Sequence, residues 1–235
     1  LLTVASYYLV FDLVFGMRLE SVVVTEPSTS PLTGLLANLR ITEVNYNPTV
    51  GLQTEFVELM NTGAAPLQLA GVRLSNAIDF TFGDLVLAPG ARTVVVQDRA
   101  AFVAHYGSAM SIAGQYDGSL SNGDENIELL LPEPYVAAIQ DFTYSETWYP
   151  FTDGDGATLV INDPAGLPGN WAVATGWHAS FVSGGTPGAG EQIVSPIATL
   201  APLTTPDTSP PLSGTLNTIV DSVVITIDGS RTFTA

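Results

Sequence analysis

The 235-residue sequence contains no cysteine and no lysine, and its six basic residues are all arginine. Without cysteine, the chain can form no disulfide, no thiolate metal site and no thiol nucleophile. Without lysine, it can supply no P-loop lysine, no Schiff base and no attachment point for pyridoxal phosphate. Composition alone therefore excludes several large classes of enzyme chemistry from this chain.

Positive charge is scarce, since six arginines face 23 aspartates and glutamates and the formal net charge is -17. Nucleic acids and anionic membrane surfaces are bound through clustered lysine and arginine, so neither is expected as a partner. A membrane span is not expected either. The apolar start of the chain is too short to cross a bilayer and carries Asp12.

Hydrophobic residues make up 46% of the chain and charged residues only 12%, which is the composition of a folded protein rather than of a disordered one. Glycine and proline are moderately frequent, with 22 and 16 residues. This combination favours many short elements joined by tight turns.

Both ends of the sequence look like parts of further β modules. Alternating residues over about 7–15 and 18–25 predict the C-terminal hairpin of an upstream β domain in residues 1–26, followed by a linker at 27–37. Residues 191–213 hold five prolines and predict an extended Pro/Thr-rich linker. Residues 214–235 contain an alternating strand, an Asp-Gly turn and a second strand, and predict the start of a further immunoglobulin-like β module. We therefore expect the natural chain to continue on both sides.

Residues 38–190 predict a β-sandwich or barrel, because short apolar runs recur there with turn signals between them. The predicted strands are 39–46, 54–60, 71–75, 78–82, 92–97, 126–131, 135–144 and 157–161. One short helix is predicted at Arg99–Tyr106, after a cap position at Gln97 and Asp98.

Two glutamates in the second predicted strand could be mistaken for a catalytic carboxylate pair. Glu55 and Glu58 are separated by an odd number of positions, and successive side chains of a strand point to opposite faces. We therefore expect the two carboxyl groups to point away from each other.

The order of motifs between Leu39 and Gly190 resembles that of a known family. The motifs are Ile41-Thr-Glu43-Val-Asn-Tyr46-Asn47-Pro48, Glu55-Phe-Val-Glu58-Leu-Met-Asn61, Leu69-Ala-Gly71, Phe80-Thr-Phe82, Leu87-Ala-Pro89-Gly90, Leu120-Ser-Asn122-Gly123-Asp-Glu125, Asp141-Phe-Thr-Tyr144, Trp148, Asp153-Gly-Asp-Gly156 with Leu159, Asn170-Trp171 and Gly185-Thr-Pro-Gly188. This order resembles the lamin tail domain, an immunoglobulin-like β-sandwich of nuclear lamins and of many secreted or surface bacterial proteins. The resemblance implies an all-β, immunoglobulin-like sandwich over about 38–190.

Two positions depart from the family pattern. Val72 stands where the family usually shows tryptophan, and Val160 stands where bacterial members often carry an acidic residue.

The sharpest candidate for chemistry is the run Asp153-Gly-Asp155-Gly, with Asp163 a little further on. Calcium prefers several carboxylate and carbonyl oxygens, so Asp153, Asp155 and Asp163 are candidate calcium ligands. The alternative is an acidic structural turn that needs no ion. No other cofactor is expected.

Other side chains with possible chemistry have simpler interpretations. Trp148, Trp171 and Trp177 could stack on a sugar, but large aromatics dominate sandwich cores and core packing is the favoured interpretation. His105 and His178 are interpreted as structural or surface residues, because no Gly-x-Ser-x-Gly elbow is present to anchor a nucleophile.

Together these features predict a non-enzymatic interaction or spacer module of a secreted or cell-surface modular bacterial protein, contacting a protein or a glycan. The alternative is an accessory domain that positions a neighbouring secreted hydrolase or nuclease outside this chain. A chromatin-facing role is disfavoured because the sequence shows neither a heptad rod nor a basic footprint. An extracellular or cell-surface location is expected from the resemblance.

Overall fold

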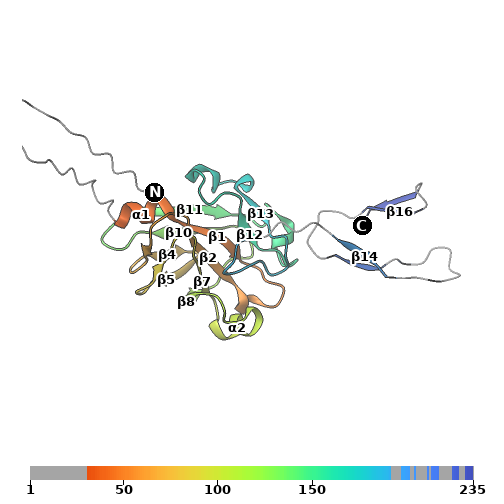
Figure 1. Ribbon diagram of the computed structural model, residues 1–235, viewed down its shortest axis with the longest axis horizontal. Coiled ribbons are helices and arrows are strands. Elements are labelled where there is room, and N and C mark those ends of the chain that lie inside the picture. Colours follow the sequence, from red (N-terminus) through yellow and green to blue (C-terminus); the bar gives the residue numbers. More distant parts are fainter. Residues whose placement is uncertain are drawn as a thin grey trace, which may run out of the picture.

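Strands dominate the computed structural model, which describes residues 31–191, 197–201, 204, 211, 213–216, 224–227 and 231–234. Two sheets of the described residues face each other and enclose the core (Figure 1). The fold is an immunoglobulin-like β-sandwich, as the sequence predicted.

The first sheet has six strands in the order β13-β12-β1-β2-β7-β8. Neighbouring strands are antiparallel except β7 and β8, which run parallel. The strands are β1 (Leu39–Asn45), β2 (Phe56–Asn61), β7 (Arg92–Val96), β8 (Ile112–Gln115), β12 (Leu159–Ile161) and β13 (Trp177–Ala179).

The second sheet has five antiparallel strands in the order β11-β10-β4-β5-β9. Its strands are β4 (Arg73–Asn76), β5 (Ile78–Thr81), β9 (Asp117–Gly118), β10 (Glu125–Leu130) and β11 (Ala138–Tyr144). A separate short pair joins β3 (Leu67–Gln68) to β6 (Val86–Leu87). Four 3₁₀ turns complete the domain, at Leu52–Thr54, Pro150–Thr152, Pro168–Asn170 and Ala174–Gly176.

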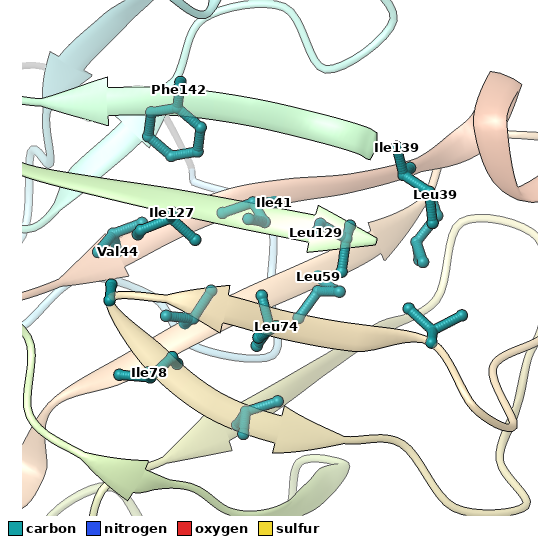
Figure 2. Packing of buried hydrophobic residues seen from close by; sticks show 14 of the residues in the cluster. Leu39, Ile41, Val44, Leu59, Leu74, Ile78, Ile127, Leu129, Ile139 and Phe142 are labelled. Atoms are coloured by element: carbon teal, nitrogen blue, oxygen red, sulfur yellow. The ribbon is translucent and has the colours of Figure 1, made fainter. Parts of the chain in front are cut away.

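The core lies between the two sheets and follows the alternation of side chains along the strands. Figure 2 shows Ile41 and Leu59 of the first sheet meeting Leu74, Ile127 and Phe142 of the second. All five are at most 2% exposed. Burial on this scale, worth about 25 cal/mol per Å² of apolar surface, is the main force that holds the sheets together.

The two sheets are joined at one corner by a buried side chain. Gln140 of β11 accepts a hydrogen bond at its Oε1 from the backbone N–H of Ile41, over 2.7 Å. This bond satisfies a backbone donor in a stretch of β1 that pairs with β2 on its other side. It places the second sheet's edge strand β11 directly beside β1.

Each of the eight predicted strands overlaps an observed strand, whereas β3, β6, β8, β9 and β13 have two to four residues and were not predicted. The predicted helix is confirmed as α2 (Arg99–Tyr106), with the Asp98 side chain accepting from the backbone N–H of Ala101. Phe102 of α2 packs on Phe56, Val94 and Val96, which forms a second small core outside the six-stranded sheet.

The predicted linker 27–37 is wrong from residue 31 onward, because helix α1 (Pro31–Asn38) occupies that stretch. Leu35 of α1 is 3% exposed in the main core. Arg40 donates to the carbonyl oxygens of Leu36 and Ala37 and so satisfies acceptors at the helix C-terminus. The predicted hairpin in residues 1–26 lies outside the described residues.

Two small antiparallel pairs follow the sandwich. β14 (Ala198–Leu200) pairs with β15 (Gly214–Leu216), so one strand of this pair lies within the predicted 191–213 linker. β16 (Val224–Ile227) pairs with β17 (Arg231–Thr234), which confirms the hairpin predicted near the C-terminus. Among the described residues, no helix has the length and apolarity needed to cross a bilayer.

Candidate functional site

A single row of side chains crosses the outer face of the six-stranded sheet. Glu58 belongs to this face because its neighbours Val57 and Leu59 point into the main core. Strand register makes each member of the row the direct cross-strand neighbour of the next. From β13 to β7 the row is His178, Val160, Glu43, Glu58 and Val94.

The two glutamates at the centre of the row are buried, at 2% exposure for Glu43 and 0% for Glu58. Glu43 Oε1 accepts from the hydroxyl of Thr158 over 2.6 Å and from the backbone N–H of Thr186 over 3.0 Å. The first of these donors lies beside β12, and the second lies far along the chain.

Glu58 uses both of its carboxyl oxygens. Oε1 accepts from the Thr42 hydroxyl over 2.6 Å and pairs with the Arg92 guanidinium. Oε2 accepts from the backbone N–H of Gly188 over 2.7 Å. The two neighbouring carboxyls therefore hold one and the same C-terminal segment, residues 181–191, which we call the exit segment.

Burial raises the pKa of Glu43 to about 8, and the neighbouring Glu58 carboxylate adds to this rise. Burial also raises the pKa of Glu58, although the adjacent Arg92 guanidinium opposes the shift. Paired carboxyls with separated pKa values are a common device for acid–base catalysis. In this domain, however, their oxygens bind the chain's own backbone and lie beneath the exit segment.

A third anchor joins the end of the exit segment to edge strand β13. Glu191 Oε2 lies 2.7 Å from His178 Nε2, and Glu191 Oε1 accepts from the backbone N–H of Phe181. His178 Nδ1 lies 2.7 Å from Asn162 Oδ1. The Asn162 amide donates to the carbonyls of Thr175 and Trp177, so its oxygen must face the imidazole.

His178 thus lies between two polar partners, with Asn162 at one ring nitrogen and Glu191 at the other. The contact with Glu191 joins the end of the exit segment to strand β13.

Glycine at position 185 allows the exit segment to approach the sheet closely. Gly185 has φ +72°, and a Cβ at this position would lie 1.8 Å from Glu43 Oε1. No side chain larger than hydrogen fits there without displacing the buried carboxyl. The Gly185-Thr-Pro-Gly188 motif therefore has a geometric role in this fold.

Glu55 faces the opposite way from Glu58, as the strand spacing predicted. Its Oε2 accepts from the Tyr116 hydroxyl over 2.8 Å and from the backbone N–H of Leu120 over 2.9 Å. Burial raises its pKa. Together with Glu125, which accepts from the N–H of Ser121, Glu55 holds the loop between β9 and β10 against the sandwich. The Glu55 carboxyl therefore also binds the chain's own backbone.

The predicted calcium ligands have separate surroundings. Asp153 accepts a 2.7 Å hydrogen bond from the Asn47 amide, and Asp163 accepts one of 3.0 Å from the backbone N–H of Ala165. Within residues 31–191 and the other described positions, no group of three or more histidine, aspartate or glutamate side chains is placed to hold a metal ion. For Asp155, Gly154 and Gly156 on either side have φ +83° and +103°, as in a tight turn.

The tryptophans belong to the packing of the domain. Trp171 and Trp177 are 1% and 0% exposed, and Trp148 packs partly buried against the same core. The Trp177 ring stacks on Phe142 with centroids 4.7 Å apart, and Arg40 lies 4.7 Å over Trp171. The core interpretation is confirmed, and no sugar platform is formed by Trp171 and Trp177.

The outer face of the five-stranded sheet has the opposite character, because its side chains are exposed or half-exposed. Asn126 links Asn76 to Asp141 in a ladder of side-chain hydrogen bonds of 2.7 and 2.8 Å. A hollow of about 340 Å³ lies over strands β4, β5 and β9 of this sheet. The residues that line the hollow are Arg73, Leu74, Ser75, Asp79, Phe80, Thr81 and Asp117.

The architecture thus defines an immunoglobulin-like β-sandwich with one covered and one open outer sheet face. Residues 36–163, more than half of the sequence, match the family model of the Lamin Tail Domain. The chain belongs to the lamin tail domain family. Searches of curated proteins and of solved structures found no match.

Proposed function

We propose that this chain is a non-enzymatic interaction and spacer module of a secreted or cell-surface modular bacterial protein, and that it contacts a protein or a glycan. The observation that supports this proposal is the difference between the two outer sheet faces. On one face, the carboxyls of Glu43 and Glu58 accept hydrogen bonds from the exit segment. The donors are the backbone N–H groups of Thr186 and Gly188. The other face presents polar side chains and a hollow to the surroundings.

The open face suits a polar contact rather than an apolar one. Asp79, Thr81 and Asp141 are exposed on it, and the side chains of Asn76 and Asn126 already hold one another in position. Preorganised polar groups reduce the entropy lost on binding. The family membership supports an interaction role, and the extracellular location is part of the proposal.

The contact is tested with the full 235-residue chain on an array of bacterial surface glycans and on intact bacteria. Thr81→Arg places a bulky charge beside the hollow, and Thr49→Arg makes the same change at an exposed threonine outside it. We expect Thr81→Arg to weaken binding at least tenfold and Thr49→Arg to leave it within twofold. Equal losses in both variants would reject the open face as the contact surface.

The non-enzymatic part of the proposal has its own readout. Each bound glycan is incubated with the full chain, and new reducing ends or released ester groups are measured over time. We expect binding without product. Glu43→Gln removes the carboxyl that is the strongest candidate for acid–base chemistry. If product forms with the parent chain and not with Glu43→Gln, the row is an active site and the proposal is overturned.

A further inference from the structure

A small pocket of about 110 Å³ lies where four separate parts of the chain meet, and it shares no residue with the hollow on the open face. Its walls come from the end of β1 with the loop after it, from the end of α2, from Gly156 before β12 and from Gly184 in the exit segment. Pockets for whole drug-sized ligands measure about 300 to 1,000 Å³. This pocket therefore has room only for the end of one side chain.

The buried polar side chain of the wall is Asn45, which is 2% exposed. Its Nδ2 donates to the Tyr106 hydroxyl over 3.1 Å, and that hydroxyl donates to the carbonyl of Gly184 over 3.0 Å. A tyrosine hydroxyl has one hydrogen, so it must accept from Asn45, which fixes the orientation of the amide. Asn45 Oδ1 is then a buried acceptor that has no hydrogen-bond partner among the described residues.

The unpaired acceptor selects the kind of group that fits the pocket. The donors of Asn45, Tyr106 and Gly184 already serve the wall, since the Gly184 N–H donates to the carbonyl of Gly156 over 2.7 Å. Leaving a buried acceptor unpaired is costly, so a group that brings a hydrogen is favoured. A lysine ammonium has three donors and no acceptor, whereas a hydroxyl and an anion both bring lone pairs of their own.

Charge around the pocket favours a cation. The lining contains no arginine, and two exposed carboxylates, Asp153 and Asp155, stand in the turn just before Gly156. The formal net charge of the chain is -17. An arginine fork suits the two oxygens of a carboxylate, but the wall offers a single amide oxygen. The compact lysine ammonium is the better match.

The mouth of the pocket suits the aliphatic part of a lysine side chain. Val50 lines the pocket and is 54% exposed although it is apolar. The Tyr106 ring is held in place by Phe56 and Phe102, with ring centroids 5.7 and 4.7 Å away. Lysine lays its four-carbon stem along apolar surface and keeps its charged end on polar groups. An apolar mouth above a buried acceptor reproduces this pattern.

We propose that this pocket binds the ammonium group of a lysine side chain that a partner protein presents. The 235 residues contain no lysine, so neither this chain segment nor a second copy of it supplies the group. The proposal goes beyond the contact proposed for the open face, because it uses other residues and has a protein side chain as its occupant. A bound partner would touch β1, α2 and the exit segment together.

The test titrates the full chain, labelled with ¹⁵N, with a capped Gly-Lys-Gly peptide at pH 7. Nuclear magnetic resonance follows the side-chain amide of Asn45 and the backbone amide of Gly184. We expect saturable shifts at both positions with the lysine peptide. Matched peptides with norleucine, which keeps the stem without the ammonium, and with arginine should bind at least fivefold more weakly.

Variants assign the binding to the pocket. Asn45→Ala removes the acceptor and should weaken binding of the lysine peptide at least fivefold. Asn45→Asp replaces the amide oxygen by a carboxylate and should tighten it at least threefold, whereas a purely structural role for Asn45 would make both variants weaker.

A second pair of variants leaves the buried wall intact and decides the question even if the Asn45 variants fail to fold. Val50→Arg places the chain's own cation at the mouth and should weaken binding at least fivefold. Val136→Arg makes the same change at a valine that is 99% exposed outside the pocket, and should stay within twofold of the parent.

Three results would overturn the proposal. They are the absence of saturable shifts with the lysine peptide, an equal affinity for the norleucine or arginine peptide, and equal losses in Val50→Arg and Val136→Arg. Glycan binding at the open face is measured without any lysine ligand, so the two proposals fail separately.

Discussion

Glu43 and Glu58 lie directly opposite each other on β1 and β2, and both carboxyls are buried while each accepts a backbone hydrogen bond from the exit segment. Like charges placed opposite each other in a sheet are destabilising. The pair is tolerated because burial raises the pKa of Glu43 to about 8 and Arg92 neutralises Glu58. The arrangement makes the domain's stability depend on pH.

The first prediction concerns that dependence. Glu43 has its pKa raised from 4.5 to about 8, so the native state holds a proton that the unfolded chain releases. Its stabilising contribution is complete below pH 4.5 and is lost as pH rises to about 8, by up to about 1.4 kcal/mol per pH unit. Burial also raises the pKa values of Glu55 and Glu58.

Urea unfolding of the full chain at pH 5, 7 and 9 should therefore show stability falling with pH. In Glu43→Gln the fall should be smaller, and the variant should be more stable than the parent at pH 9. Glu128→Gln serves as the control and should follow the parent. Stability that rises between pH 5 and 8 would contradict the burial of neutral Glu43.

A second prediction separates close approach from backbone strain at two glycines. Gly185 and Gly90 share φ +72°, yet a Cβ at Gly185 would meet Glu43 at 1.8 Å, whereas a Cβ at Gly90 meets nothing within 4 Å. Gly90→Ala should cost about 1 to 2 kcal/mol through the left-handed backbone alone. Gly185→Ala should cost about 2 kcal/mol more, measured by urea unfolding. Equal costs would mean that Glu43 does not contact the exit segment closely.

A third prediction concerns the cap of α2. Asp98 accepts from the N–H of Ala101, so Asp98→Ala should lower the free energy of unfolding by about 1 kcal/mol. Asp98→Asn retains a capping oxygen and should stay within about 0.3 kcal/mol of the parent. Should both substitutions have the same effect, the charge near the helix rather than the cap would be responsible.

A fourth prediction tests the calcium hypothesis for Asp153, Asp155 and Asp163. Asp153 is engaged by Asn47, and Asp163 by the backbone of Ala165. We expect the same melting temperature in millimolar calcium and in chelator, and the same loss for Asp153→Ala in both. A calcium-dependent rise in melting temperature that Asp153→Ala abolishes would establish the metal site instead.

The strand pattern was predictable because alternation and turn residues are local signals, and each of the eight predicted runs overlaps a strand. The short strands were missed because two to four residues give no measurable period. Helix α1 was missed because the proline- and serine-containing run that ends at Pro31 suggested a linker, whereas burial of Leu35 and the Arg40 contacts stabilise a helix.

The buried carboxyl row could not be predicted, since it depends on contacts such as Glu43 with Thr186, across more than a hundred residues. Glu43 and Glu58 are charged residues in predicted strands, and alternation alone assigns such residues to a solvent face. The Gly185-Thr-Pro-Gly188 motif was the available signal. A glycine there is required because the backbone passes next to a carboxyl.

The central claim is that the sandwich extends beyond the matched residues 36–163 and is completed by β13 and the exit segment. Trp177, which is fully buried on Phe142, belongs to this later part. Thermal unfolding of chains that end at residues 163, 191 and 235 tests it most directly. We predict cooperative transitions with equal midpoints for the two longer chains and no cooperative transition for the chain ending at 163. A cooperative transition in the shortest chain at the same midpoint would contradict the claim.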